Sequence, residues 1–386
     1  MIERAIKEQL LHYANLFPVV TLTGPRQSGK STLLQNSFPD YHYVSLEEPD
    51  IRFMAQSDPK GFIRNLPKRS IIDEAQYLPD LFSYIQTVVD RENVAGMYIL
   101  SGSQNFLLMQ NVTQSLAGRA AVLKLLPFSY QELKCAHRAP GTPDEAMFHG
   151  GYPRIYDKNI RPNEFYPHYI QTYIERDVRL LRNIPDLSLF IRFIKLCAGR
   201  IGQLINISSL ANECGITTTT AQAWLSVLET SYVVFLLKPY YKNYNKRLTK
   251  SPKIFFSDTG LACSLLSIEN TTQLNTHYLR GALFENWVIA EYLKKSYNMV
   301  KDPSLFFWRD SNGNEIDLII EKGDELDAIE IKSNDTMNFS HFKGLDYWQK
   351  LTGASSTKCH LVYTGEHNLH TTHGDYVTWT EWSEYR

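Results

Sequence analysis

The sequence lacks any long hydrophobic run and contains few cysteines. No apolar segment approaches the ~20 residues that a membrane-spanning helix requires. The five cysteines are scattered and show none of the paired spacings of structural metal sites. Residues 1–8 mix charged and apolar residues as an amphipathic helix does, and they lack the apolar core of a signal peptide. We therefore expect a cytoplasmic protein with reduced, buried thiols and no membrane partner.

A large net charge is also missing, but the balance changes along the chain. The formal net charge is −1, from 40 Lys and Arg against 41 Asp and Glu. Residues 131–280 contain 18 basic and 12 acidic residues, whereas residues 281–386 contain 10 basic and 17 acidic ones. A basic middle segment favours a polyanionic partner, and an acidic final segment favours a divalent metal.

The first motif that is present is a phosphate-binding loop. Residues 24–31 read Gly-Pro-Arg-Gln-Ser-Gly-Lys-Ser, a full match to G-x-x-x-x-G-K-[ST]. A β-branched run at 17–23 precedes the loop and a helical segment follows it, so backbone amides and a helix N-terminus would point at a polyphosphate. Lys30 is expected on the β- and γ-phosphates, and Ser31 on Mg²⁺. The predicted nucleotide-binding residues are Gly24, Pro25, Arg26, Gln27, Ser28, Gly29, Lys30, Ser31 and Thr32.

Adjacent carboxylates end a later strand-like segment, residues 69–73. Alternation along a strand would send Asp73 and Glu74 to opposite sides. Asp73 is then a candidate Mg²⁺ ligand, and Glu74 is a candidate base that orients and deprotonates the attacking water. The second carboxylate favours ATP hydrolysis over a switch GTPase.

Further residues are candidates for the γ-phosphate region. Ser103 or Gln104, after the strand-like run 96–101, would sense the γ-phosphate, although ordinary loop polarity explains either residue equally well. Arg119 is a candidate stabiliser of the transferred phosphate, in cis or from a neighbouring subunit, with a simple surface arginine as the alternative. Because an arginine supplied in trans requires a second copy of the chain, we expect a homo-oligomer.

The order of elements predicts the fold class of the first segment. Strand-like runs alternate with helical stretches, which is typical of an α/β fold with a parallel sheet and crossover helices. The turn-rich segment 138–143 marks the end of this region, and helices are expected over 163–183 and 187–199. The predicted strands cover residues 19–23, 41–46, 70–73, 96–101 and 121–126.

The middle segment contains a predicted helix-turn-helix with a basic wing. Residues 207–216 and 217–230 read as its two helices, and strands at 232–237 and 253–256 bracket a loop. No acidic residue occurs between Glu229 and Asp258, and cations in the loop alternate with tyrosines, which suits contact with a nucleic-acid backbone. A subunit contact or a solvated wing remains an alternative. The predicted DNA-binding residues are Lys242, Lys246, Arg247 and Lys250.

A hairpin in the final segment brings a second set of charged residues together. Gly323-Asp324 is a two-residue turn signal, and counting outward from it pairs Asp317 with Glu330. Alternation would place Glu315, Asp317, Glu330 and Lys332 on one face. The other face would then carry the apolar residues Ile316, Leu318, Ile320, Ile329 and Ile331.

Opposed carboxylates repel each other unless a cation lies between them. We therefore expect Asp317 and Glu330 to hold Mg²⁺, with Lys332 positioning a water or neutralising a phosphate. Glu285, in a helix-like segment upstream, is a candidate for a further carboxylate. A solvated polar face on an amphipathic hairpin is the alternative.

The spacing of Asp317, Glu330 and Lys332 resembles the PD-(D/E)XK phosphodiesterase signature, with Glu285 in the place of the upstream acid. The whole chain resembles bacterial and archaeal AAA-type ATPases that carry a C-terminal domain of unknown function. That resemblance implies an AAA-type ATPase domain at 1–130, a helical lid and winged helix at 131–280, and a nuclease-like domain at 281–386. The matching segments are 24–32, 72–76, 115–119, 150–153, 173–178 and 315–318.

These features together predict an enzyme that binds and hydrolyses ATP with Mg²⁺ and acts on DNA. In this hypothesis, a Mg²⁺-dependent phosphodiesterase site lies near the C-terminus. The alternative is an ATP-dependent switch or scaffold in which an inactive nuclease-like domain binds a partner.

Overall fold

The computed structural model describes residues 2–103, 115–174, 186–241 and 251–385. The chain forms two compact units. The first comprises Met1–Phe128, Thr230–Tyr232 and Ser296–Lys301, and the second contains the remaining residues. Because the second unit includes most of both 131–280 and 281–386, the division of these segments into separate domains stays a prediction. Among the described residues, no helix combines the length and apolar character needed to cross a membrane.

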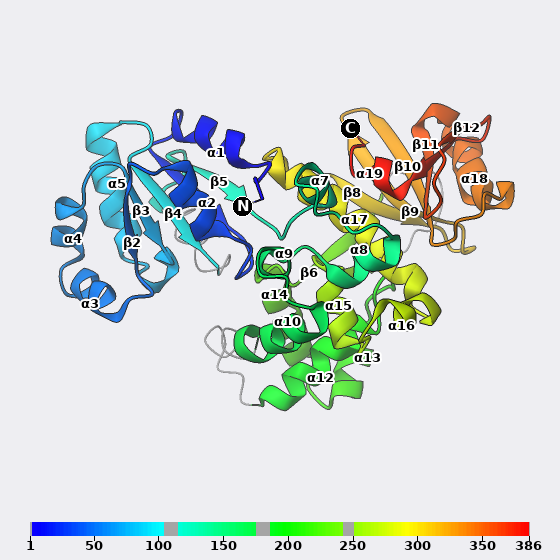
Figure 1. The fold of residues 1–386 in the computed structure, drawn as a ribbon, viewed down its shortest axis with the longest axis horizontal. Coiled ribbons are helices and arrows are strands. Elements are labelled where there is room, and N and C mark those ends of the chain that lie inside the picture. The colour runs from blue at the N-terminus through cyan, green and yellow to red at the C-terminus, as the bar shows by residue number, and fades with distance from the viewer. Residues whose placement is uncertain (1, 104–114, 175–185, 242–250, 386) are drawn as a thin grey trace. The chain divides into compact units, whose positions relative to one another are not determined.

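The first unit is built on a five-stranded parallel sheet (Figure 1). Its strand order is β2-β3-β4-β1-β5, and every pairing is parallel. All five strands lie within three residues of their predicted bounds, because each is a short run with apolar residues packed against the core. The strands are β1 (Val19–Thr23), β2 (His42–Ser45), β3 (Ser70–Asp73), β4 (Tyr98–Gly102) and β5 (Ala120–Lys124).

Helices cover both faces of this sheet. One apolar cluster packs α1 and α2 against one face, and a second packs α3, α4 and α5 against the other. The unit is therefore a three-layer α/β fold, as predicted. Since the strands are parallel, the segments that follow β1 and β3 leave the sheet at the same edge. The helices are α1 (Lys7–Ala14), α2 (Lys30–Ser37), α3 (Pro49–Ser57), α4 (Pro59–Asn65) and α5 (Leu81–Glu92).

The second unit begins with a helical region. Its short helices often start at proline, which suits the first turn of a helix because the missing amide would have no helical partner there. The described helices of this region are α7 (Tyr130–Cys135), α8 (Pro143–His149), α9 (Pro153–Asp157), α10 (Pro162–Tyr169), a π-helical turn (Ile170–Ile174), α12 (Leu187–Ala198), α15 (Thr259–Leu265) and α16 (Thr271–Thr276).

The two helices predicted for the helix-turn-helix are present as α13 (Ile207–Cys214) and α14 (Thr218–Thr230). Gly215 ends α13 in the left-handed conformation, with φ of 78°. The strands that follow, β6 (Val234–Pro239) and β7 (Lys253–Phe256), pair as an antiparallel hairpin. However, β6 also pairs with β8, so this hairpin is the edge of a larger sheet and does not stand alone.

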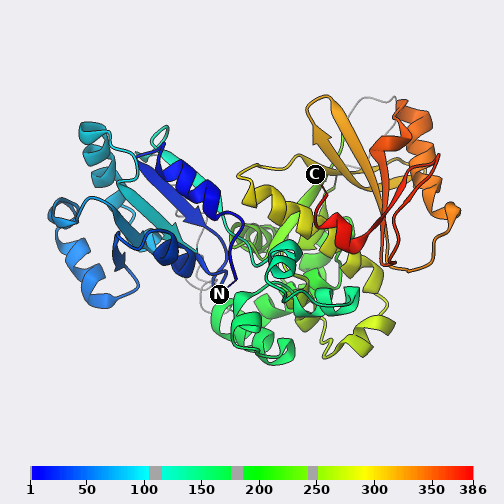
Figure 2. The same ribbon diagram turned by 45° about the horizontal axis from the view of Figure 1, so that its top comes forward.

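That larger sheet has eight strands in the order β12-β13-β11-β10-β9-β8-β6-β7 and mixes parallel with antiparallel pairs. One apolar cluster packs its residues with α17, and another packs the opposite face with α18 (Figure 2). The remaining elements are α17 (Arg280–Asn298), β8 (Leu305–Arg309), β9 (Glu315–Lys322), β10 (Glu325–Lys332), α18 (Lys343–Thr352), β11 (Cys359–Tyr363), β12 (Leu369–His370), β13 (Asp375–Thr378) and α19 (Trp379–Trp382).

The register of the β9–β10 hairpin agrees with the prediction along the ladder from Lys322–Glu325 to Leu318–Ile329. The predicted faces are wrong at one residue. Ile316 packs with Ile319 on the α18 side, whereas Leu318 lies on the α17 side. The reason is a β-bulge, because the pairing of β9 with β8 shifts by one residue between Ile316 and Ile319. Such a bulge reverses alternation locally and re-aims the side chains beside it.

The cysteines follow the prediction with one exception. All five are free thiols, and four of them are buried. Cys135, in the last turn of α7, is exposed instead.

Candidate functional site

The loop between β1 and α2 has the backbone that a phosphate cradle requires. Gly24 has φ of +154°, and a Cβ atom built on it would lie 2.0 Å from the carbonyl oxygen of Leu125, so only glycine fits. Gly29 is left-handed and leads into the first turn of α2. The buried hydroxyl of Ser28 has no hydrogen-bond partner within the described structure. An orphaned donor inside the loop suits a phosphate oxygen.

Lys30 is buried within the curve of the same loop. Its ammonium donates hydrogen bonds to the carbonyl oxygens of Gly24 at 2.9 Å and Pro25 at 2.8 Å. These contacts hold the charge beside the loop amides, where the phosphates are expected. Arg26 points elsewhere and donates to the Tyr77 hydroxyl at 3.4 Å. Neither Gln27 nor Thr32 is buried in this loop.

Asp73 is the centre of a hydrogen-bonded cluster at the end of β3. Its Oδ2 atom accepts hydrogen bonds from Ser31 and from Tyr43, each at 2.6 Å. Its Oδ1 atom accepts from the amide of Glu74 at 3.0 Å and from the Ser101 hydroxyl. Four donors thus fix a buried carboxylate beside the loop, and they join the two residues predicted to bind Mg²⁺.

The sequence does not predict the roles of Tyr43 and Ser101. Burial and then the Asp73 carboxylate raise the pKa of Tyr43 above its usual range, so this tyrosine keeps its proton and donates it to Asp73 in a hydrogen bond. Tyr43 lies on β2 and Ser101 on β4, the two strands that flank β3. No local pattern in the sequence marks either residue, because both reach Asp73 only through the strand order.

Glu74 does not continue the strand, contrary to the predicted alternation. Its φ of 54° is left-handed, and it precedes a 3₁₀ turn at Ala75–Tyr77. A left-handed non-glycine residue costs free energy and is common at functional sites. The carboxylate accepts hydrogen bonds from Gln76 and from Ser103, the latter at 3.2 Å. The structure therefore brings Ser103 and Glu74 together at the edge of the sheet where the loop lies.

Arg119 lies far from the loop of its own unit. Its carbonyl accepts from the amide of Val19, at the start of β1, whereas the loop follows the end of that strand. A strand of this length separates the two ends by roughly 15 Å. The guanidinium pairs instead with Asp90, with Nη2 at 3.0 Å from Oδ2. The structure does not bring Arg119 to its own predicted phosphate site.

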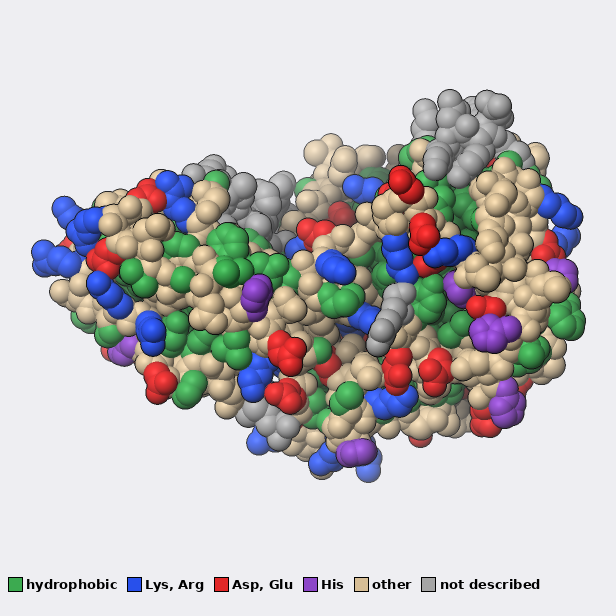
Figure 3. Space-filling model, turned by 90° about the horizontal axis from the view of Figure 1, so that it is seen from above, with side chains coloured by type: hydrophobic (Ala, Val, Ile, Leu, Met, Phe, Trp, Pro, Cys, Tyr) green, Lys and Arg blue, Asp and Glu red, His purple; other side chains and the backbone are tan. Residues whose placement is uncertain are grey.

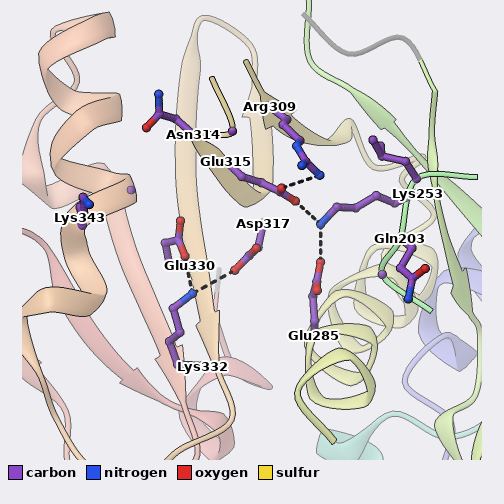
Figure 4. A pocket seen from close by; sticks show the side chains of 14 residues that line it. Gln203, Lys253, Glu285, Arg309, Asn314, Glu315, Asp317, Glu330, Lys332 and Lys343 are labelled. Carbon is purple, nitrogen blue, oxygen red and sulfur yellow. Dashed lines mark hydrogen bonds and ion pairs between the residues drawn. The ribbon is translucent and has the colours of Figure 1, made fainter. Parts of the chain in front are cut away.

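A second polar site lies within the second unit, in a pocket of about 720 Å³ (Figure 4). Lys332 Nζ lies 2.8 Å from Glu330 Oε2 and 3.9 Å from Asp317 Oδ2. The amide of Ile331 donates to Asp317 at 2.9 Å, which fixes this carboxylate near the bulge. The three predicted residues of the hairpin therefore do meet in one pocket.

Burial and mutual repulsion shape the carboxylates of this pocket. Burial, followed by the nearby Asp317 charge, raises the pKa of Glu330 to about 8. Burial likewise raises the pKa of Glu285 to about 7, although Lys253 opposes this shift. A cation bound between Asp317 and Glu330 would offset both the burial and the Asp317 charge that raise the pKa of Glu330.

The donor set of the pocket suits a metal with few protein ligands. In the part of the chain that is described, no three His, Cys, Asp or Glu side chains converge as a metal cluster. Asp317 and Glu330 provide two carboxylates, which is the number that Mg²⁺ takes when water and phosphate complete its shell. Glu285 faces Lys253, at 2.9 Å, and not the carboxylate pair.

The pocket is also lined by three residues that the sequence does not mark as site residues. These are Lys253, Glu315 and Arg309. Lys253 Nζ lies 2.5 Å from Glu315 Oε1, and Arg309 lies 3.4 Å from the other oxygen of that carboxylate. Charge spacing in the sequence marks Glu315 only as a neighbour of Asp317. No local sequence feature identifies Lys253 as a site residue, because the sequence pattern places it in the predicted wing.

The predicted wing lies partly outside the described residues. Lys242, Lys246, Arg247 and Lys250 are among those outside, so their predicted DNA contact stays a prediction. Of the neighbouring tyrosines, Tyr240 is buried in the sheet cluster, whereas Tyr241 is exposed. On the face drawn in Figure 3, side chains of both signs are interspersed among the coloured residues.

The loop, the Ser31–Asp73 pair and the parallel sheet define an AAA-type P-loop ATPase, and the AAA domain family matches residues 16–134. Two families described only as domains of unknown function, DUF8612 and DUF4143, match residues 142–272 and 280–382. The chain belongs to the same family as the uncharacterized protein Rv2008c of Mycobacterium tuberculosis. That protein is 30% identical over 359 residues, covering 91% of this chain and 78% of its own length.

More distant similarities extend to archaea. Uncharacterized protein MJ1544 of Methanocaldococcus jannaschii is 23% identical, over 82% of this chain and 76% of its own. Among solved structures, the Walker-type ATPase PABY2304 of Pyrococcus abyssi is 16% identical, with a TM-score of 0.46 over 69% of this chain and 96% of its own.

Proposed function

We propose that this ATPase hydrolyses ATP at the loop of its first unit, with Ser31 and Asp73 as ligands of Mg²⁺ and Glu74 as the base. The observation that carries the proposal is the 2.6 Å contact between the Ser31 hydroxyl and Asp73, which puts both metal-binding groups at the loop. Ser31 and Asp73 would hold Mg²⁺, which, when bound with the nucleotide, would neutralise charge that develops on the phosphates.

The chain's own residues would do the rest of the chemistry. Lys30 and the loop amides bind the phosphate tail, and Asp73 is held in place by Tyr43 and Ser101. Glu74 orients the attacking water and takes its proton. Ser103, at 3.2 Å from Glu74, positions that carboxylate or reads the γ-phosphate.

Arg119 is proposed to act from a neighbouring subunit. It lies at the opposite edge of the sheet from its own loop, so a role at phosphate requires a second copy. The homo-oligomer predicted from the sequence would provide that copy.

The test separates binding from hydrolysis. Glu74→Gln should retain affinity for ATP but lower the turnover number by roughly 100-fold or more, since general base catalysis contributes about that much. Glu8→Gln, a change at an exposed carboxylate on α1, is the matched control and should hydrolyse ATP normally. Full turnover by Glu74→Gln would rule out its role as the base.

A second proposed function concerns the pocket of the second unit. We propose that it is a Mg²⁺-dependent phosphodiesterase site of the PD-(D/E)XK kind that acts on DNA. The convergence of Asp317, Glu330 and Lys332 supports it. A divalent cation there would polarise the phosphate and acidify a bound water. Lys332 would neutralise the phosphate or position the water.

Plasmid nicking with Mg²⁺ or Mn²⁺, with and without ATP, tests this second function. The native chain should nick DNA, Glu330→Ala should not, and the exposed change Glu366→Ala should behave as the native chain. Equal background levels in all three would favour the rival proposal, in which the nuclease-like fold only binds a partner and ATP drives a switch.

A further inference from the structure

Lys253 places an ammonium group inside the pocket of the second unit. The residue belongs to β7, and only 3% of it is exposed. Its Nζ lies 2.9 Å from Glu285 on α17 and 2.5 Å from Glu315 on β9 (Figure 4). One cation thus joins three elements that are distant in the sequence.

The charges around Lys253 are arranged in pairs. A buried carboxylate is costly unless a cation or several donors compensate it. Lys253 compensates Glu285, and Lys253 together with Arg309 compensates Glu315. The neighbouring pair, Asp317 and Glu330, shares the separate cation of Lys332. Burial lowers the pKa of Lys253, but the surrounding carboxylates outweigh it and raise the pKa, which keeps the ammonium charged.

We propose that the Lys253 ammonium permanently neutralises Glu285 in the pocket. Glu285 then holds Lys253 in position and does not bind metal. A divalent metal therefore has only Asp317 and Glu330 as carboxylate ligands. This inference rests on the proposed metal site and refines it. It departs from the PD-(D/E)XK resemblance, in which Glu285 takes the place of the upstream acid. It also makes the β6–β7 hairpin part of the pocket, since the cation comes from β7.

The consequence for metal binding is specific. With Lys253 in place, neutralising Glu285 removes no metal ligand, because that carboxylate already has its cation. With Lys253 removed, Glu285 would lose its paired cation and Glu315 would keep only Arg309, so a divalent cation is the natural replacement for the ammonium. Variants of Glu285 and Lys253 therefore show whether Glu285 pairs with Lys253 or binds the metal.

The experiment titrates the full-length protein with Mn²⁺ alone and measures bound ion by electron paramagnetic resonance and calorimetry. Every sample carries Asp73→Asn, which removes the metal ligand of the ATP site. Glu285→Gln should bind Mn²⁺ within about twofold of this parent, whereas Glu330→Gln should bind about tenfold more weakly or worse. Lys253→Met should gain a second ion or bind Mn²⁺ more tightly than the parent, and Lys253→Arg should match the parent.

Each outcome decides the proposal. A tenfold loss in Glu285→Gln, or no gain in Lys253→Met, would overturn it. If Lys253→Met does not fold, the Glu285→Gln titration alone decides whether Glu285 is a metal ligand. If the parent binds no Mn²⁺ but Lys253→Met does, the role of Lys253 stands and the proposed phosphodiesterase fails. Binding in none of the samples would overturn both.

Discussion

The hydroxyl of Tyr43 donates a 2.6 Å hydrogen bond to Oδ2 of Asp73, the same oxygen that accepts from Ser31. If Ser31 binds Mg²⁺ as proposed, Tyr43 would still hold the Asp73 carboxylate in place. We therefore expect Tyr43→Phe to raise the Mg²⁺ concentration for half-maximal ATP turnover about tenfold, as loss of a ligand's supporting hydrogen bond typically does.

Tyr41→Phe is the matched control for that change. Tyr41 is two residues away, and its hydroxyl donates at 2.9 Å to the carbonyl of Gly96, before β4 begins. Its removal should leave the Mg²⁺ requirement unchanged. Equal Mg²⁺ curves for both variants would contradict the positioning role of Tyr43.

Gly24 gives a prediction about the loop backbone. Gly24→Ala should abolish ATP binding, because its Cβ atom would overlap the Leu125 carbonyl oxygen. Gly118→Ala is the control, since Gly118 also has a positive φ but has no atom within 4 Å of the added Cβ. Circular dichroism would verify that both variants fold. Normal ATP affinity in Gly24→Ala would show that the loop has another conformation.

The raised pKa of Glu330 predicts how stability depends on pH. Its value of about 8 in the folded chain lies above the ordinary value of 4.5, so between these pH values the folded chain holds a proton that the unfolded chain releases. The contribution of Glu330 to stability is therefore complete at low pH and is lost as pH rises toward about 8.

Glu330→Gln should remove that part of the pH dependence. In metal-free buffer, its unfolding temperature should fall less between pH 5.5 and pH 8 than that of the native chain. The exposed change Glu366→Gln should reproduce the native profile. Parallel profiles for all three proteins would mean that Glu330 titrates normally.

The proposed subunit arrangement can be tested by mixing variants. Lys30→Met should bind ATP weakly but retains Arg119, whereas Arg119→Ala retains a complete loop. If Arg119 acts in trans, each variant alone should be nearly inactive, and mixed oligomers should recover part of the turnover. No recovery on mixing, with subunit exchange verified, would contradict this arrangement.

The predicted DNA contact of the wing concerns residues outside the described structure. Replacing Lys242, Lys246 and Arg247 with Ala should weaken DNA binding and flatten its dependence on salt. The slope of log K against log salt should become smaller by roughly 2 to 3, because three phosphate contacts are lost. An unchanged slope would remove the wing from DNA binding.

Features that depend on local pattern are predictable from the sequence. The strands of the first sheet, the loop at 24–31 and the register of the β9–β10 hairpin follow from alternation, glycine positions and turn signals. The meeting of Asp317 with Glu330 follows from that register. These features need only information from residues close along the chain.

Features that depend on tertiary packing are beyond such reasoning. Tyr43 reaches Asp73 only because β2 lies beside β3, and Lys253 reaches Glu285 only because β7 lies near α17. The bulge in β9 comes from its pairing with β8, so the hairpin alone could not indicate that Ile316 changes face. Glu74 departs from alternation because its backbone turns at the end of β3.

The most direct test of the central claim is calorimetric titration of the purified chain with ATP in the presence of Mg²⁺, beside Lys30→Met. We expect the native chain to bind one ATP per protomer, and Lys30→Met to bind at least about tenfold more weakly, a loss of about 1.4 kcal/mol. No heat of binding from a folded native chain, or equal affinity in the two proteins, would contradict the assignment of the loop as the nucleotide site.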